Sequence, residues 1–285
     1  MIYFGPAGNS ESFYEQGHKN TFEAFEWLYN MGLNAFEYSF GRGVRLGQAA
    51  AEKIAEQAAL YSVRLSAHAP YYINLATDEP QKQEGNARYF LQSVTAAHWM
   101  GAKRVVFHAG SHGKLSAQEA FERAKNALRG ILDELEKLGL FDIEICPETM
   151  GRIKQIGDLD EVIALCKMDE RLVPAIDFAH LHARGRGALN TEADFAAVLD
   201  KLESGLGGER AKHFHVHFAR IEYTAAGEKM HRTFADTKYG PDFEPFAAQI
   251  VKRGLEPTLI CESRGTMAED AAEMKRIYLE TRARA

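Results

Sequence analysis

Eight short apolar segments alternate with eight amphipathic segments along the 285 residues of this chain. The apolar segments have the length of strands, and we place them at 2–7, 33–40, 63–69, 104–109, 142–148, 172–178, 212–219 and 257–262. The intervening segments have helical periodicity, at 20–31, 46–61, 84–100, 117–138, 159–167, 192–203, 242–253 and 267–282. Strands that alternate with helices form a parallel sheet, and eight such units predict an α/β fold closed into a (β/α)8 TIM barrel.

Nothing in the sequence interrupts this alternation. There is no low-complexity linker and no break in composition, so we expect a single TIM-barrel domain over residues 1–285. The absence of a GxGxxG motif after the first strand argues against a dinucleotide-binding fold. The longest irregular stretch, about 220–240, follows the seventh strand, where barrel loops carry function. Ser116 with Glu119, and Thr266 with Glu269, have the spacing of helix capping boxes.

Charge and cysteine usage limit the classes of partner. A net charge of −6 argues against a generally basic surface, so binding to a nucleic acid would need a local patch. The three scattered cysteines form no disulfide framework, which is typical of a reducing compartment. No signal-peptide pattern and no membrane-spanning apolar run is present. We therefore expect a cytoplasmic protein without a membrane partner, and a monomer.

Metal-capable side chains stand at the ends of successive predicted strands. In a parallel barrel these ends open on one rim, where residues distant in sequence converge. His180 follows three residues after one of them, and His231 lies in the long loop after the seventh strand. The six strand-end residues are His68, His108, Glu148, Asp177, His217 and Glu262.

A single histidine at a strand end is more often a hydrogen-bonded core residue than a ligand. Six consecutive strand ends favour metal, because burying so many ionisable groups without a cation would cost several kcal/mol each. Mixed imidazole and carboxylate ligation favours two or three Zn²⁺ ions, with Mn²⁺ or Fe²⁺ as possible alternatives. Two ions joined by one carboxylate acidify a shared water, which suits attack at phosphorus.

Basic residues are enriched in the predicted loops of the same rim. Because the whole protein is acidic, this enrichment suggests a polyanionic ligand, although a solvated rim is the alternative for any single residue. Tyr71, in HAPYYINLA, either stacks on a distorted duplex or packs within its loop. The basic residues are Arg42, Arg45, Lys114, Arg152, Lys154, Arg184, Arg186, Arg220, Lys229, Arg232 and Arg264.

The motifs HAPYYINLA, FHAGSH, ETMG, DFAH and ICES together resemble the endonuclease IV family of apurinic/apyrimidinic endonucleases, within the xylose-isomerase-like barrel superfamily. The resemblance runs from about residue 60 to the C-terminal helix. It implies hydrolysis of the DNA backbone on the 5′ side of abasic sites with three zinc ions. Damaged double-stranded DNA would then be the partner, in base excision repair.

The resemblance also implies roles for individual residues. Glu148 would be the bridging and catalytic carboxylate. One ion would be held by His68 and His108, a second by Asp177, His217 and Glu262, and a third by His180 and His231. Tyr71 matches the family tyrosine beside the first ligand, and Arg42 would enter the duplex.

Two regions depart from the family pattern. The family's Asp-x-His after the seventh strand appears here as Lys229-Met230-His231, and a lysine cannot replace an aspartate ligand. Glu228 is long enough to take over; otherwise the third ion would be weak or absent. Lys229 would in that case contact a phosphate, and Arg232 is also expected to bind DNA. The segment EYSFGRGVR also differs, which indicates a divergent branch of the family with altered substrate choice.

Two other functions fit the same sequence. A sugar isomerase or epimerase would need one divalent ion at Glu148, Asp177, His217 and Glu262, and would leave the other histidines unexplained. A metal-stabilised DNA-binding module without catalysis would follow from a weakened third site. Among the remaining residues, His213 and His215 are predicted to lie deeper in the barrel, and Cys146 to fill its core.

Overall fold

Eight parallel strands form the wall of a barrel in the computed structural model, which describes residues 1–285. The TIM-barrel fold predicted from the sequence is confirmed, and every barrel strand lies within a predicted segment. The strands are β1 Tyr3–Pro6, β2 Ala35–Ser39, β3 Arg64–His68, β4 Arg104–Phe107, β5 Glu144–Pro147, β6 Ala175–Asp177, β7 His215–Phe218 and β10 Thr258–Cys261.

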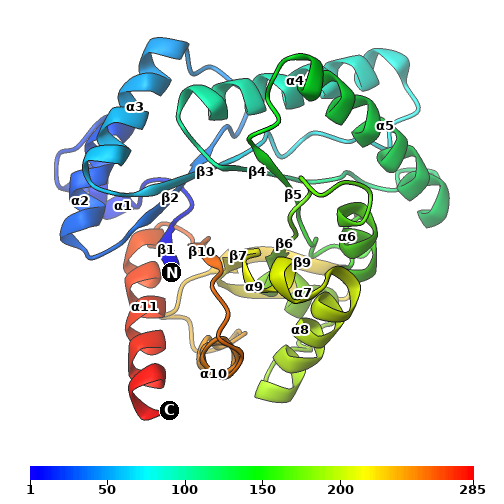
Figure 1. Cartoon of the computed structure of the whole chain (residues 1–285). Helices are drawn as coiled ribbons and strands as arrows, with labels where there is room; N and C mark the ends of the chain where they lie inside the picture. Colours follow the sequence, from blue (N-terminus) through cyan, green and yellow to red (C-terminus); the bar gives the residue numbers. More distant parts are fainter.

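Helices cover the outside of this wall (Figure 1). The last helix, α11, lies beside β1, so elements from the two ends of the chain are neighbours. Three short helices, α1, α7 and α9, were not predicted. The helices are α1 Glu11–Glu15, η1 Thr21–Glu23, α2 Ala24–Asn30, α3 Gln48–Leu60, α4 Pro80–Trp99, α5 Ala117–Lys137, α6 Leu159–Cys166, α7 Phe178–Arg184, α8 Glu192–Leu206, α9 Gly208–Lys212, α10 Glu244–Arg253 and α11 Met267–Arg284.

The barrel wall consists of two four-stranded sheets, in the orders β1-β10-β7-β6 and β2-β3-β4-β5. One seam between them is joined by the parallel bridge of Ala7 with Glu37, and the other by Ile145 with Leu172 and Glu148 with Ala175. At the first seam Gly5 leaves no room for a side chain, because a Cβ there would lie 1.9 Å from the carbonyl oxygen of Ala35. Closure therefore depends on a glycine at this position.

The stretch 220–240 was predicted to be irregular, and this is wrong for its first half. Strands β8 (Arg220–Thr224) and β9 (Gly227–Arg232) form an antiparallel hairpin with a register shift between Glu222 and Tyr223. The hairpin belongs to neither barrel sheet. It contacts α7, so it lies against the helix that follows β6.

One of the two predicted capping boxes is present. Ser116 and Glu119 cap α5 reciprocally, as expected. Thr266 and Glu269 do not cap α11, because Glu269 accepts a hydrogen bond from Ser12 and the Thr266 hydroxyl is bonded to Asp270.

The apolar core lies mainly between the strands and the surrounding helices, and phenylalanines such as Phe178, Phe195 and Phe246 are fully buried in it. Inside the barrel a separate small cluster contains Val106, Cys146 and Ala175, so Cys146 fills core as predicted. These side chains are small, and the polar strand-end residues lie next to them at the rim of the barrel. None of the helices combines the length and apolar character that a membrane crossing requires.

Candidate metal centre

All six strand-end residues come together at the carboxyl end of the barrel, around the Glu148 carboxylate. Glu148 directly follows β5 and is 1% exposed. Its Oε2 lies 3.1 Å from Nε2 of His68, the last residue of β3, and 3.0 Å from Nε2 of His108, which follows β4. Its Oε1 lies 3.1 Å from Nδ1 of His217 on β7. One carboxylate therefore contacts imidazoles from three strands.

A second group of possible ligands combines Glu148 with residues from β6, β7 and the end of β10. Glu148, Asp177, His217 and Glu262 each offer an atom within 4.8 Å of the others, which is close enough to surround one cation. His217 Nδ1 is 3.5 Å from Oε1 of Glu262, the residue after β10.

A third group lies beside α7 and the hairpin. Asp177, the N-cap of α7, accepts the backbone N–H of His180 at Oδ1 with a distance of 2.7 Å. This cap fixes His180 at the rim, with Nδ1 3.2 Å from Asp177 Oδ2. His180 Nε2 lies 3.5 Å from Glu228 Oε2, and His231 Nε2 lies 4.0 Å from Asp177 Oδ2. The structure thus brings together His180, His231 and Glu228.

A β-bulge explains how Glu228 reaches this group. In the hairpin Glu222 pairs with Met230 and Tyr223 with Glu228, so Lys229 has no partner and is the extra residue. Residues three apart on a regular strand point to opposite faces, but one extra residue restores a common face. Glu228 and His231 accordingly line the same cavity, of about 260 Å³.

Gly151, in the ETMG motif, makes room for this arrangement. A Cβ on Gly151 would lie 2.6 Å from Cβ of Glu228 and 3.0 Å from Cδ2 of His180. The Gly151 carbonyl also accepts the Glu228 backbone N–H at 3.1 Å. The position of Glu228 is therefore held by backbone contacts.

The protonation of these groups is strongly perturbed. Burial disfavours a charge on His68, but the hydrogen bond to Glu148 and the charge of that carboxylate raise the pKa of His68 to about 9. For His180 and His217, burial is likewise outweighed by neighbouring carboxylates, which raise the pKa of each ring. The pKa of Glu148 is lowered in spite of burial by the charges of His217 and His108. In the metal-free protein, protons on the histidines balance the buried carboxylates, and divalent cations would compete with these protons for the same nitrogens.

Two buried polar atoms without hydrogen-bond partners indicate that these residues fit divalent cations. Asp177 Oδ2 and His231 Nε2 are buried and have no hydrogen-bond partner. Buried polar atoms without partners are rare in folded proteins, and a cation between them would satisfy both. Two other imidazole rings are oriented by backbone carbonyls. His68 Nδ1 lies 2.7 Å from the Ala69 carbonyl oxygen, and His180 Nδ1 lies 2.9 Å from the Thr149 carbonyl oxygen. Each ring then presents Nε2 to the centre.

The four residues predicted to bind DNA have different surroundings. Tyr71 is 58% exposed and lines the cavity of the metal centre. Arg42 is exposed in the loop after β2. The Lys229 ammonium lies 2.5 Å from Glu222, and Arg232 pairs with the same carboxylate, so both charges are engaged by the hairpin itself.

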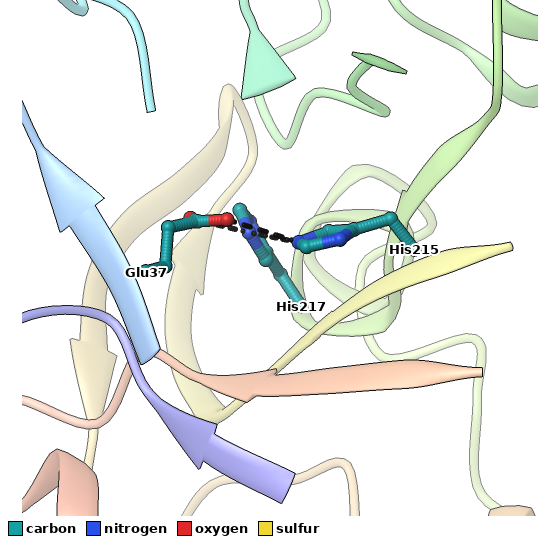
Figure 2. A group of neighbouring side chains, drawn as sticks. All are labelled: Glu37, His215 and His217. Carbon is teal, nitrogen blue, oxygen red and sulfur yellow. Dashed lines mark hydrogen bonds and ion pairs between the residues drawn. The ribbon is translucent and has the colours of Figure 1, made fainter. Parts of the chain in front are cut away.

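Sequence analysis missed one acidic residue, Glu37 on β2. Its carboxylate lies 3.0 Å from His215 Nε2 and 2.9 Å from His217 Nε2, inside the barrel beneath the rim (Figure 2). The signal was a single charge in the middle of the predicted strand 33–40. His215 lies in the barrel as expected, whereas the prediction for His213 is wrong, because its side chain is 47% exposed.

Three comparisons place the chain among known proteins. An uncharacterized protein of Methanocaldococcus jannaschii, MJ0133, is 34% identical over 280 residues, 98% of both chains. A probable endonuclease 4 of Shouchella clausii is 29% identical over 168 residues, and the match spans 57% of this chain and 55% of the relative.

Two solved structures have the same fold over nearly their whole length. A D-tagatose 3-epimerase-like protein has a TM-score of 0.74 at 18% identity, covering 99% of each chain. Endonuclease IV from Thermus thermophilus has a TM-score of 0.69 at 21% identity, covering 100% of this chain and 98% of its own. The family model described as xylose isomerase-like TIM barrel matches residues 25–279. The chain belongs to the xylose isomerase-like TIM barrel family.

Proposed function

We propose that this protein is a metal-dependent phosphodiesterase that hydrolyses the DNA backbone on the 5′ side of abasic sites. The observation that carries the proposal is the number of converging ligands. Glu148, Asp177, His217 and Glu262 suffice for one ion, yet His68, His108, His180 and His231 lie at the same rim. These surplus imidazoles supply donors for a second and a third ion, most simply zinc.

The relatives support the same choice. Proteins named probable endonuclease 4 match about half of this chain and about half of their own length. The aligned half alone does not carry the activity of the whole relative, so substrate and partner are part of the proposal.

The residues of the centre suit attack on a phosphodiester. Bound divalent ions would supply Lewis acidity toward a phosphate oxygen and would acidify a water molecule. Glu148 links two ligand groups through its two oxygens, so it fixes their separation. Asp177 presents Oδ2 to both His180 and His231 and joins the second group to the third. Tyr71 offers an exposed ring beside the cavity for a sugar or base.

A sugar epimerase remains a second candidate because of one observation. Glu148, Asp177, His217 and Glu262 converge by themselves on a point within mutual reach, which is what a single-ion enzyme requires. Such an enzyme would not depend on His231 or Glu228. The number of bound ions therefore separates the two functions.

The test uses a duplex oligonucleotide with one tetrahydrofuran abasic analogue. We expect a nick on its 5′ side, no cleavage of the undamaged duplex, and loss of activity after prolonged chelation. Elemental analysis of the same sample should find two or three ions per chain. The proposal is wrong if metal-loaded protein leaves this duplex whole while interconverting a ketose and its epimer. Metal-dependent affinity for abasic duplex without cleavage would instead indicate a binding module.

A further inference from the structure

A second acid and histidine cluster lies inside the barrel, beneath the metal centre. Its members are Glu37 on β2, Ser66 on β3, and His215 and His217 on β7. The two histidines are 0% exposed, and Glu37 is 1% exposed. Figure 2 shows the Glu37 carboxylate facing both rings. A buried carboxylate is costly unless its oxygens are satisfied, so the contacts of Glu37 show what it does.

Three side chains lie close to the Glu37 carboxylate. The Ser66 hydroxyl donates to Oε2 at 2.8 Å, and His215 Nε2 lies 3.0 Å from the same oxygen. His217 Nε2 lies 2.9 Å from Oε1. Oε1 has no aligned hydrogen-bond partner, and His217 Nε2 lies beside it; because an ionised carboxylate only accepts hydrogen bonds, a proton on His217 Nε2 would satisfy this oxygen.

His217 connects this cluster to the metal centre. Its Nδ1 faces Glu148 and Glu262, at 3.1 and 3.5 Å, while its Nε2 faces Glu37. A neutral imidazole has one N–H, and the acceptor on one side decides which nitrogen bears it. With the proton held on Nε2 by Glu37, the lone pair of Nδ1 points to the centre.

The other oriented histidines use a different kind of acceptor. His68 and His180 are held by the backbone carbonyls of Ala69 and Thr149, which are neutral. His180 Nδ1 also lies 3.2 Å from Oδ2 of Asp177, which belongs to the centre itself, so of these three rings only His217 faces a carboxylate outside the centre. A carboxylate behind a ligating imidazole increases the basicity of the ligand as well as fixing its orientation.

We infer that Glu37 is a positioning residue: it fixes His217 with Nδ1 toward the metal centre and strengthens the binding of the ion that His217 shares with Glu148, Asp177 and Glu262. The inference rests on the proposed metal-dependent function. Glu37 itself stays outside the ion's ligands, one imidazole away.

The same geometry permits one rival arrangement. Glu37, His215 and His217 offer atoms within 4.8 Å of one another and would in principle surround a cation of their own. Such a cation would take His217 Nε2 and leave Nδ1 to hold a proton or a second ion. His217 Nδ1 faces two carboxylates, Glu148 and Glu262, whereas its Nε2 faces only Glu37, and this favours a cation on the Nδ1 side and the positioning role for Glu37.

The experiment measures Co²⁺ binding to the full chain through its visible absorption spectrum. The metal-free wild-type protein is compared with Glu37→Gln, which keeps the shape and removes the charge. We expect Glu37→Gln to weaken the affected ion about 10- to 100-fold and to shift its absorption bands. The number of Co²⁺ ions bound at saturation should not change. Glu144→Gln, at the opposite end of the barrel, is the matched control and should leave the Co²⁺ affinity at the wild-type value.

The outcomes separate the possible failures. A Co²⁺ affinity of Glu37→Gln within twofold of wild type overturns the positioning role, even if the melting temperature of the metal-free variant falls. A loss of one whole ion at saturation also overturns it, because Glu37 would then be a ligand. If Glu37→Gln does not fold, Ser66→Ala decides: it should weaken Co²⁺ binding several-fold, and an unchanged Co²⁺ affinity contradicts the inference.

Wild-type protein that binds no Co²⁺ refutes the metal centre together with this inference. Glu37-dependent Co²⁺ binding without DNA cleavage refutes the nuclease alone.

Discussion

The Glu148 carboxylate is the point at which the ligand groups of the centre meet. Its Oε2 serves His68 and His108, and its Oε1 serves His217 and lies 3.3 Å from His180 Nδ1. Such a residue contributes little packing, so an amide in its place should preserve the fold, although loss of the buried charge lowers the stability of the metal-free protein.

Glu148→Gln is therefore expected to abolish cleavage of the abasic duplex, by at least about 10³-fold. The amide keeps the shape of the side chain, so the far-ultraviolet circular dichroism spectrum should remain that of the wild type. The measurement is the single-turnover rate on the tetrahydrofuran duplex with metal-loaded protein. Wild-type rates in Glu148→Gln would exclude a bridging role.

His68 makes the stability of the metal-free protein depend on pH. Its pKa is raised from 6.5 to about 9 by Glu148. A group whose folded pKa is raised contributes stability that is fully present below its unfolded pKa and is lost as the pH rises through the folded pKa. Urea unfolding of chelated protein should therefore show a fall in the free energy of unfolding between pH 6.5 and about 9, to which His68 contributes at most about 3 kcal/mol.

The same titration gives an internal control. In metal-loaded protein the ion replaces the proton on His68, so the fall across this pH range should be absent. In Glu148→Gln it should be smaller than in the wild type, because the partner charge of His68 is gone. Equal pH dependence in all three samples would contradict the assignment.

At the scale of elements, the hairpin β8–β9 positions two of the residues proposed to hold a third ion, Glu228 and His231. Its bulge at Lys229 places Glu228 and His231 on one face, and Lys229 pairs with Glu222. Lys229, which stands where the endonuclease IV pattern has an aspartate, is thus the extra residue of the bulge, and Glu228 before it lies 3.5 Å from His180 at the centre.

Glu228→Gln should lower the metal content at saturation by one ion per chain, because an amide is a much weaker ligand than a carboxylate. Lys229→Ala removes the neighbouring side chain without touching the centre, and it should retain all ions. Elemental analysis of both variants after dialysis checks this. Equal ion counts in the two variants would place Glu228 outside the third site.

The sequence predicted elements better where their pattern was long and regular. The eight barrel strands and the long helices α4 and α5 follow from apolar periodicity, which local sequence carries. Strand β9, with Glu228, Lys229, His231 and Arg232, has no apolar alternation, so nothing local indicated a strand. Helix α7 begins directly after Asp177, and its start depends on a side-chain cap.

The candidate site was predictable in so far as topology decides it. Strand ends of a parallel barrel share one rim, so His68, Glu148 and Glu262 converge whatever the details of packing. Glu37 was missed because it lies in the interior of its strand, where the sequence gives no sign of which partners face it. Its contacts with His215 and His217 come from strands that are distant in the chain and meet only when the barrel closes.

At the scale of the whole molecule, the centre depends on closure of two half-barrels. Glu37 belongs to one four-stranded sheet and His217 to the other, and their strands face each other across the barrel interior. Glu148 likewise stands at the second seam, bridged to Ala175. A change that opens a seam should therefore weaken both stability and metal binding.

Gly5→Ala tests this coupling at the first seam. The added Cβ would lie 1.9 Å from the Ala35 carbonyl oxygen, and because that atom is backbone, β1 and β2 must move apart. We expect a loss of about 3 kcal/mol or more in the free energy of unfolding, and weaker binding of the ion shared by His217 and Glu148.

Gly130→Ala is the matched control. Gly130 is exposed in the middle of α5 with no atom within 4 Å of an added Cβ, so alanine there should stabilise the protein by up to about 1 kcal/mol. Opposite signs for the same substitution, with metal affinity reduced only in Gly5→Ala, would tie the centre to closure of the barrel; equal and small effects would show that the seam tolerates separation.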